Sequence, residues 1–300
     1  MDIFLQQLIN GLTVGSLYAL VALGYTMVYG VMKLINFAHG DLVALSAFAG
    51  LTIYAQIFGE GKTSIYIVLG VFIITAIVIA IVGVLLERLA YRPLRTAPRL
   101  SAVVSALGAG LVIQNSIMLI WGPNMKIFPS NLLPSTIWDF GGVVFTFTQA
   151  MILGVSAVLM IALFIFINKT KMGTAIRATA IDQDAAKLMG INVNRIIMII
   201  FIIGSALGAV AGLFIGIYYR GITFDMGWMY GLNAFVAAIM GGIGNIPGAM
   251  LGGILLGLFN AMISGYISSE WAETFTFILL VVILIFRPTG ILGETIAEKV

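Results

Sequence analysis

Long uncharged apolar runs, separated by short polar segments, make up most of this chain. A helix needs about 20 apolar residues to cross the hydrocarbon core of a bilayer, and several runs approach or exceed that length. The runs are apolar throughout and do not alternate, which excludes a membrane β-barrel. The pattern predicts an all-α, polytopic membrane protein with one domain over residues 1–300. The uncharged runs are 3–32, 42–59, 63–86, 100–125, 140–168, 196–219, 226–269 and 274–286.

Two of the runs are too long for one ordinary crossing. Run 226–269 corresponds to about 66 Å of helix, which is enough for two crossings. It is interrupted midway by Gly241, Gly242, Gly244 and Pro247. We therefore expect a broken helix at this point. Run 3–32, about 45 Å as a helix, predicts a tilted or broken helix.

The distribution of Lys and Arg predicts the orientation. Twelve of the 15 basic residues fall at position 33 or within segments 88–99, 169–195 and 287–299. Basic residues concentrate in cytoplasmic loops, so we expect these segments on the cytoplasmic side. The N-terminus then lies outside and the C-terminus inside. This arrangement requires an odd number of crossings, and we predict nine; a re-entrant first helix would make eight.

Composition limits the chemistry that the chain can perform. It is 61% hydrophobic and 9% charged, whereas soluble domains carry about 25% charged residues. The net charge of +3 comes from residues that flank membrane segments, so we expect contact with lipid and no nucleic-acid partner. The chain has no Cys and one His, with no metal-ligand cluster and no Ser-His-Asp arrangement. We expect no enzyme activity, cofactor or metal site.

Segment 168–195 is a polar island between two apolar runs. It reads NKTKMGTAIRATAIDQDAAKLMGINVNR and holds five of the basic residues. Its middle, 175–189, lacks Gly and Pro and is rich in Ala, which predicts short helices. A helical loop of this size is more than a connector needs. We interpret it as a docking element for a cytoplasmic partner.

Glycines spaced four apart form a stripe in run 196–219. The stripe consists of Gly204, Gly208, Gly212 and Gly216. Such a stripe lets a neighbouring backbone approach closely. Packing inside one subunit is the favoured interpretation, and a subunit interface or a moving helix contact is the alternative. The glycine cluster around Pro247 is interpreted either as a packed kink or as the broken helix of a transport site.

Several polar positions are candidates for a transport pathway, because polar groups at membrane depth indicate function. The candidates for the pathway or a helix break are Asn36, His39, Asp41, Asn233, Asn245 and Pro247. His39 could titrate, but a helix-capping role at the membrane interface is the favoured interpretation for the segment from Asn36 to Asp41. No apolar run carries a central charge, which argues against an ion-coupled carrier.

Two levels of similarity point to a known family. The motif Asp184-Ala185-Ala186-x-x-x-Gly190 resembles the E-A-A-x-x-x-G core of the cytoplasmic loop of ABC importer permeases, with Asp in place of the usual Glu. Further segments are similar to LivH-type permeases of high-affinity branched-chain amino acid ABC importers. These segments are 15–42, 87–95, 234–257 and 287–293.

The resemblance implies a larger assembly in a bacterial-type plasma (inner) membrane. An external solute-binding protein delivers the solute, this chain pairs with a second homologous permease subunit, and two cytoplasmic ATPase subunits drive transport. The helix around 184–190 is then expected to seat in a groove on an ATPase. Related permeases carry urea, amides or other amino acids, and these remain alternatives, as does an ion-coupled amino acid carrier.

Overall fold

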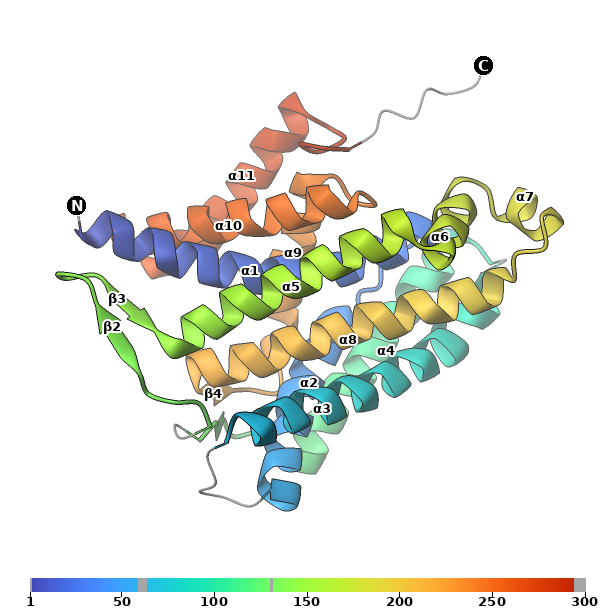
Figure 1. The fold of residues 1–300 in the computed structure, drawn as a ribbon. Helices are drawn as coiled ribbons and strands as arrows, with labels where there is room; N and C mark the ends of the chain where they lie inside the picture. The colour runs from blue at the N-terminus through green and yellow to red at the C-terminus, as the bar shows by residue number, and fades with distance from the viewer. Residues whose placement is uncertain (1, 59–63, 96, 130–131, 294–300) are drawn as a thin grey trace.

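The computed structural model describes residues 2–58, 64–95, 97–129 and 132–293 as a bundle of long helices with two short strand pairs (Figure 1). The α-helices are α1 (Asp2–Met32), α2 (His39–Ile53), α3 (Ile65–Leu86), α4 (Arg99–Trp121), α5 (Phe147–Lys169), α6 (Lys171–Ile181), α7 (Gln183–Leu188), α8 (Val193–Tyr219), α9 (Met226–Gly241), α10 (Ile246–Tyr266) and α11 (Ala272–Phe286). The strands are β1 (Lys126–Ile127), β2 (Ile137–Asp139), β3 (Val144–Thr146) and β4 (Gly221–Ile222). Short π or 3-10 segments follow α2 (Tyr54–Phe58) and α3 (Glu87–Tyr91 and Arg92–Leu94) and precede α11 (Ser269–Trp271).

Eight of the described helices are long and apolar enough to cross a membrane. Each of them overlaps a predicted apolar run, and this confirms the all-α, polytopic class. The ninth predicted crossing corresponds to α9, an apolar helix of only 16 residues. Residues 294–299, which belong to the basic C-terminal segment, lie outside the described part of the chain.

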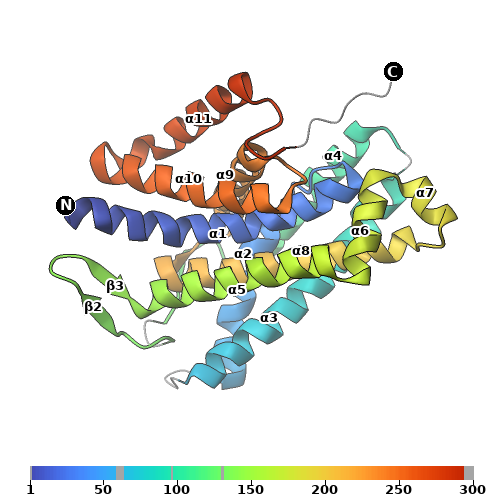
Figure 2. The same ribbon diagram turned by 45° about the horizontal axis from the view of Figure 1, so that its top comes forward.

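The central helix of the bundle is α1. It continues without a break for 31 residues, about 46 Å. It packs against α5, α8, α9 and α10, and Figure 2 shows it between α5 and α10. Of the two predicted alternatives, a tilted or a broken helix, the broken one is wrong. A helix that is apolar on all sides is stable only inside a protein or membrane, and this explains why α1 forms the core.

The two ends of the bundle differ in structure. At the end where the N-terminus lies, β2 and β3 form a hairpin, and β1 pairs with β4 (Figure 1). The second pair joins the connection after α4 to the connection between α8 and α9. The opposite end carries α6 and α7. We refer to these as the hairpin end and the loop end.

The glycine stripe of α8 packs inside this chain. Gly204 faces α1, Gly208 and Gly212 face α2, and Gly216 faces the ring of Phe128. All four positions therefore pack against other segments of this chain, as the favoured interpretation expects.

The predicted break in run 226–269 lies between α9 and α10. Gly242 and Gly244 have φ values of 106° and 99°, in the left-handed region that favours glycine. The break is therefore confirmed.

Replacing Gly212 with Ala is expected to destabilise the fold. The added Cβ would collide with the backbone carbonyl of Val43 and the hydroxyl of Ser46, and overpacking costs about 1–3 kcal/mol. The thermal unfolding midpoint of the detergent-purified protein should therefore fall. Gly154→Ala in α5 is the matched control, because no atom lies within 4 Å of its new Cβ. Equal midpoints for the two variants would contradict the described packing.

Candidate functional site

The first candidate site is the break between α1 and α2. After α1 ends, Lys33 adopts a φ of 54° and the chain turns back into the bundle. The His39 ring, at the start of α2, lies against Gly24 on α1 and Gly208 on α8. Gly24 precedes the end of α1 at Met32 by eight residues, about 12 Å of helix. α2 therefore begins well inside the bundle.

The predicted helix-capping, interfacial role of Asn36, His39 and Asp41 was wrong. The N-cap residue of α2 is Ala38, and no side chain caps the helix. Asn36 Oδ1 instead accepts a hydrogen bond of 2.8 Å from the Tyr91 hydroxyl, and both residues are buried. The prediction placed this segment at the membrane surface. It lies deeper because the glycines of α1 and α8 leave room for the imidazole.

His39 belongs to an aromatic cluster at the centre of the bundle. Its ring packs edge-on against Tyr25, with the ring centroids 5.0 Å apart. Its Nε2 atom is buried and has no hydrogen-bond partner among the described residues. The Tyr25 ring also packs against Phe235 of α9, with ring centroids 5.9 Å apart, and Phe235 packs against Phe37, with ring centroids 6.0 Å apart. The cluster connects α1, the segment before α2, and α9.

Asp41, in the first turn of α2, is partly exposed at the middle of the bundle. Its Oδ2 atom lies 2.5 Å from the position that a Cβ on Gly110 would occupy. Gly110 is the middle residue of α4. Among the described residues, no hydrogen bond or ion pair reaches this carboxylate. Asp41 directly precedes the apolar run 42–59, so the observation that no apolar run carries a central charge still holds. The fold nevertheless places this carboxylate beside the middle of α4.

The connection between α8 and α9 repeats the organisation of the connection between α1 and α2. Arg220 follows α8 with a φ of 61°, as Lys33 follows α1. Among the described residues, these two alone combine a positive φ with a side chain. A short apolar helix begins six residues after each of them. α1 and α8 run in opposite directions (Figure 1), so the two units form an inverted repeat of a kind found in transporters.

The two units also share sequence at a constant spacing of 187 positions. Ile35-x-Phe37 matches Ile222-x-Phe224, and Leu45-x-Ala47-Phe48 matches Leu232-x-Ala234-Phe235. The equivalent glycines, Gly40 and Gly227, pack together: a Cβ on Gly227 would lie 2.6 Å from the carbonyl oxygen of Gly40. The repeat was not predicted, although matches at a constant spacing are a signal for it.

The remaining pathway candidates lie in α9 and at the start of α10. Asn233 is buried and donates to a backbone carbonyl one turn earlier in α9. Asn245 is the N-cap of α10: its Oδ1 accepts from the Gly248 N–H, and its Nδ2 donates to the Leu292 carbonyl, both at 2.9 Å. Pro247 lies in the first turn of α10, where its missing N–H is not needed.

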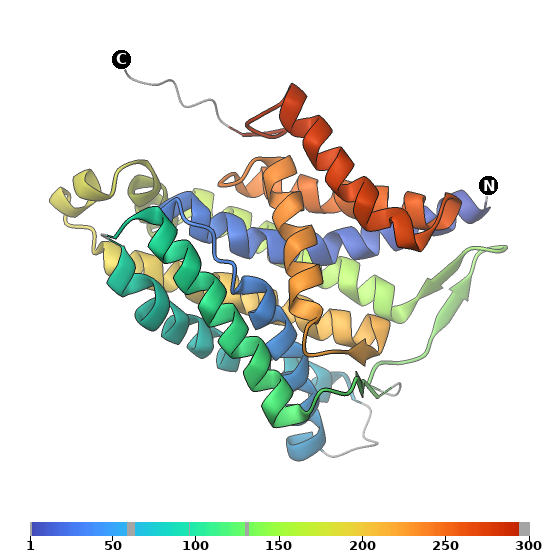
Figure 3. The same cartoon turned by 180° about the vertical axis from the view of Figure 1, so that it is seen from behind.

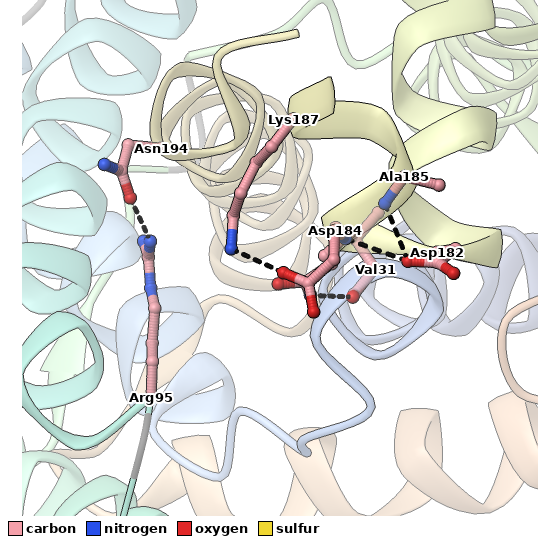
Figure 4. A network of polar contacts seen from close by, with 8 residues as sticks. Val31, Arg95, Asp182, Asp184, Ala185, Lys187 and Asn194 are labelled. Carbon is pink, nitrogen blue, oxygen red and sulfur yellow. Dashed lines mark hydrogen bonds and ion pairs between the residues drawn. The ribbon is translucent and has the colours of Figure 1, made fainter. Parts of the chain in front are cut away.

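The second candidate site is the polar island, which forms α6 and α7 as predicted. Asp182 caps α7 by accepting hydrogen bonds from the N–H groups of Ala185 and Asp184, at 3.0 and 2.8 Å. These bonds hold the pKa of the Asp182 carboxyl below its usual range. Gln183 Nε2 donates to the Val31 carbonyl in the last turn of α1, at 2.9 Å (Figure 4). The polar island is therefore attached to the central helix.

The motif residues of the polar island occupy different environments. Ala186 is buried, whereas Asp184, Ala185 and Gly190 are exposed. Asp184 forms an ion pair of 2.8 Å with Lys187 (Figure 4). Gly190 has a φ of 82°, which favours glycine at this position.

Three large apolar side chains beside the motif are exposed. Ile181, Leu188 and Met189 are 88%, 89% and 82% exposed, and Figure 1 shows α7 projecting beyond the bundle. Exposed apolar groups gathered among polar residues are typical of interaction surfaces.

A further polar contact joins the end of α3 to the start of α8. Arg95 forms an ion pair with Glu87 and donates to Asn194 Oδ1 at 2.6 Å (Figure 4). Glu87 is buried, and a buried charge requires a partner. This contact was not predicted, because Arg95 and Asn194 lie 99 positions apart in the chain.

These features define a class before any relative is considered. The chain is a polytopic membrane protein in which two helices of an inverted repeat, α2 and α9, begin inside the bundle, as is typical of membrane transport proteins. Among the described residues, no group of three or more His, Asp or Glu side chains could hold a metal ion.

The chain belongs to the family described as "Branched-chain amino acid transport system / permease component", which matches residues 7–284. It is 43% identical over 303 residues to the "High-affinity branched-chain amino acid transport system permease protein LivH" of Escherichia coli (strain K12), covering 99% of this chain and 98% of that relative. It is 44% identical to the corresponding permease protein BraD of Pseudomonas aeruginosa, with the same coverage. No solved structure matches the chain.

Tyr91→Phe is expected to lower stability, because it removes the hydroxyl that donates to buried Asn36. A buried polar group left without its partner costs about 1–3 kcal/mol, so the thermal midpoint in detergent should fall. Tyr66→Phe is the control, since Tyr66 is 81% exposed on α3. If both variants unfold at the wild-type temperature, the buried contact does not contribute to stability.

Proposed function

We propose that this chain is the permease subunit of an ATP-driven importer and forms the translocation pathway for branched-chain amino acids. The relatives that support this proposal are named branched-chain amino acid transport permeases and match nearly the whole chain. The starts of α2 and α9 inside the bundle suit a pathway, because interrupted helices commonly surround transport sites near the bilayer midplane. ATP hydrolysis takes place on two separate cytoplasmic subunits.

The single observation that carries the ATP-driven part is the exposed apolar surface of Ile181, Leu188 and Met189. These side chains fit a groove on an ATPase, where their burial would provide binding energy. The five basic residues of the polar island favour a cytoplasmic loop end. The N-terminus then lies outside and the C-terminus in the cytoplasm.

Two connections would carry movement of the ATPases into the bundle. Gln183 attaches α7 to the last turn of α1. On its other side, α7 leads directly into α8, whose N-cap Asn192 accepts a hydrogen bond of 3.1 Å from the Arg195 N–H. Because α1 leads into α2 and α8 leads into α9, a displacement of α7 would act on both units of the repeat.

A second homologous permease subunit and an external solute-binding protein complete the proposed importer. In α4, only 17% of the most apolar 18-residue stretch is buried within this chain, and in the segment containing α11 only 11% is. These helices therefore offer surface for lipid and for the second permease. The solute-binding protein would dock at the hairpin end, opposite the ATPases.

Urea, amides and other amino acids are the alternative solutes. More distant relatives, the fructose import permease proteins FruF and FruG of Bifidobacterium longum, match at 27% and 24% identity. The much higher identity to branched-chain amino acid permeases favours that solute class. Uptake of labelled isoleucine in proteoliposomes, in competition with urea, acetamide, alanine and fructose, tests this choice. ATP-independent uptake driven by an ion gradient would favour the carrier alternative.

Leu188→Asp is expected to abolish copurification of the ATPases, because a charge would replace an apolar side chain in the proposed groove. The tagged chain is purified in mild detergent and its partners are identified by mass spectrometry. Ile127→Asp is the matched control, since Ile127 is 70% exposed at the hairpin end. Retention of the ATPases by Leu188→Asp would argue against docking through α7.

Gln183→Ala is expected to weaken coupling without preventing docking. The change removes the hydrogen bond to Val31 but leaves the exposed apolar side chains intact. The variant should retain its ATPases and their ATP hydrolysis but import less isoleucine per ATP. Lys187→Ala, which removes only an exposed ion pair within the loop, should keep the wild-type ratio. An unchanged ratio in Gln183→Ala would show that the contact with α1 does not transmit movement.

A further inference from the structure

Asp41 is an unpaired carboxylate at the interface of the two repeat units. It directly follows Gly40, which meets Gly227 where α2 and α9 begin. Gly110, at the middle of α4, leaves the space that the carboxylate occupies. The side chain is partly exposed, and none of the described residues forms a hydrogen bond or an ion pair with it.

A partly exposed carboxylate at this depth is incompatible with a lipid-facing surface. Ionisable side chains within membrane segments face the bundle interior or a water-filled cavity. The open side of Asp41 therefore faces water or another polar surface. Figure 3 shows the surrounding face, where α9 crosses the centre, α2 and α4 lie on one side, and α11 lies on the other.

The surroundings of Asp41 suit an ammonium group beside an aliphatic side chain. A Cβ on Gly231 would lie 2.9 Å from the Cα of Gly40 and 3.0 Å from the Tyr25 hydroxyl, so Tyr25 lies beside the residue that precedes Asp41. The Tyr25 and Phe235 ring centroids are 5.9 Å apart. Phe235 and its neighbour Phe37 are partly exposed. Aromatic faces attract cations and also bury aliphatic groups. One face therefore combines a negative charge with an apolar, aromatic surface.

We propose that the Asp41 carboxylate binds the ammonium group of the amino acid during its passage through the membrane. An amino acid crosses as a zwitterion, and its ammonium group requires a counter-charge once it leaves bulk water. The aromatic cluster beside Asp41 then contacts the branched side chain. The inference rests on the proposed function, so its tests measure assembly and ATP hydrolysis separately from uptake.

The first test compares Asp41→Asn with Asp41→Glu in the complete importer, reconstituted in proteoliposomes. Asp41→Asn should lower isoleucine uptake by about tenfold or more, because a charge-assisted contact is lost. Asp41→Glu should retain a substantial part of the uptake. Both variants should keep their ATPases and the ATP hydrolysis stimulated by the solute-binding protein. Wild-type uptake by Asp41→Asn would overturn the inference, whereas failure of the unmodified importer to transport isoleucine would count against the proposed function.

The second test leaves the carboxylate in place and disturbs only its position. A Cβ on Gly110 would press on Asp41, whereas a Cβ on Gly108, two residues earlier in α4, would have no atom within 4 Å. Gly110→Ala should therefore reduce isoleucine uptake, and Gly108→Ala should not. Equal uptake by the two variants, with intact assembly, would overturn the inference.

The third test uses the absence of cysteine from the chain. Asp41→Cys should react with water-soluble methanethiosulfonates, and isoleucine should slow the reaction. The anionic sulfonatoethyl reagent should restore uptake by restoring a negative charge, while the cationic trimethylammonium reagent should not. Ile77→Cys on α3, 56% exposed, is the lipid-facing control and should react slowly.

A thiol at position 41 as unreactive as the one in Ile77→Cys would overturn the inference. If the variants at position 41 do not assemble, Leu45→Cys replaces them, because Leu45 is partly exposed one turn further along α2. If isoleucine slows the labelling of Leu45→Cys, the result supports the proposed pathway face. If Leu45→Cys is not labelled, or if isoleucine does not slow its labelling, the inference is overturned.

Discussion

The contact between Gly40 and Gly227 is the constraint on which the centre of the molecule depends. In lipid, every backbone polar group must find a partner within the protein, so a helix can begin inside a membrane only where other protein surrounds it. The two glycines let the starts of α2 and α9 meet backbone to backbone. Gly24 and Gly208 leave a space that the His39 ring fills. The starts of α2 and α9 inside the bundle therefore depend on glycines, which have no side chain.

In the inverted repeat, the connection between α1 and α2 is linked to the loop end, and the connection between α8 and α9 is linked to the hairpin end. The break after α1 lies close to Val31, where Gln183 attaches the loop end. The break after α8 lies beside β4, which pairs with β1 at the hairpin end. A site between α2 and α9 is thus flanked by one connection to each end. This arrangement suits alternating access, in which the two ends open in turn around a fixed site.

Features that depend on local sequence could be predicted, and features that depend on tertiary packing could not. The apolar runs, the break between α9 and α10 and the short helices of the polar island follow from hydropathy and from glycine and proline positions. The depth of Asp41 did not follow, because a polar residue between two apolar runs was assigned to the membrane surface. Its true position depends on distant glycines in α4, α8 and α9. The contact from Gln183 to Val31 likewise joins segments far apart in the chain.

A central acid without a partner was expected of ion-coupled carriers, yet the chain belongs to a family described as the permease component of branched-chain amino acid transport systems. The demands on a pathway explain why an unpaired Asp41 fits the proposed importer. A solute-binding protein can supply the affinity, so the pathway must only reduce the cost of moving a charged group through the membrane. Passage requires binding that is favourable enough for entry and weak enough for release. A single, partly exposed carboxylate meets both conditions, whereas a carboxylate already paired with a buried cation would offer the ammonium group no free charge.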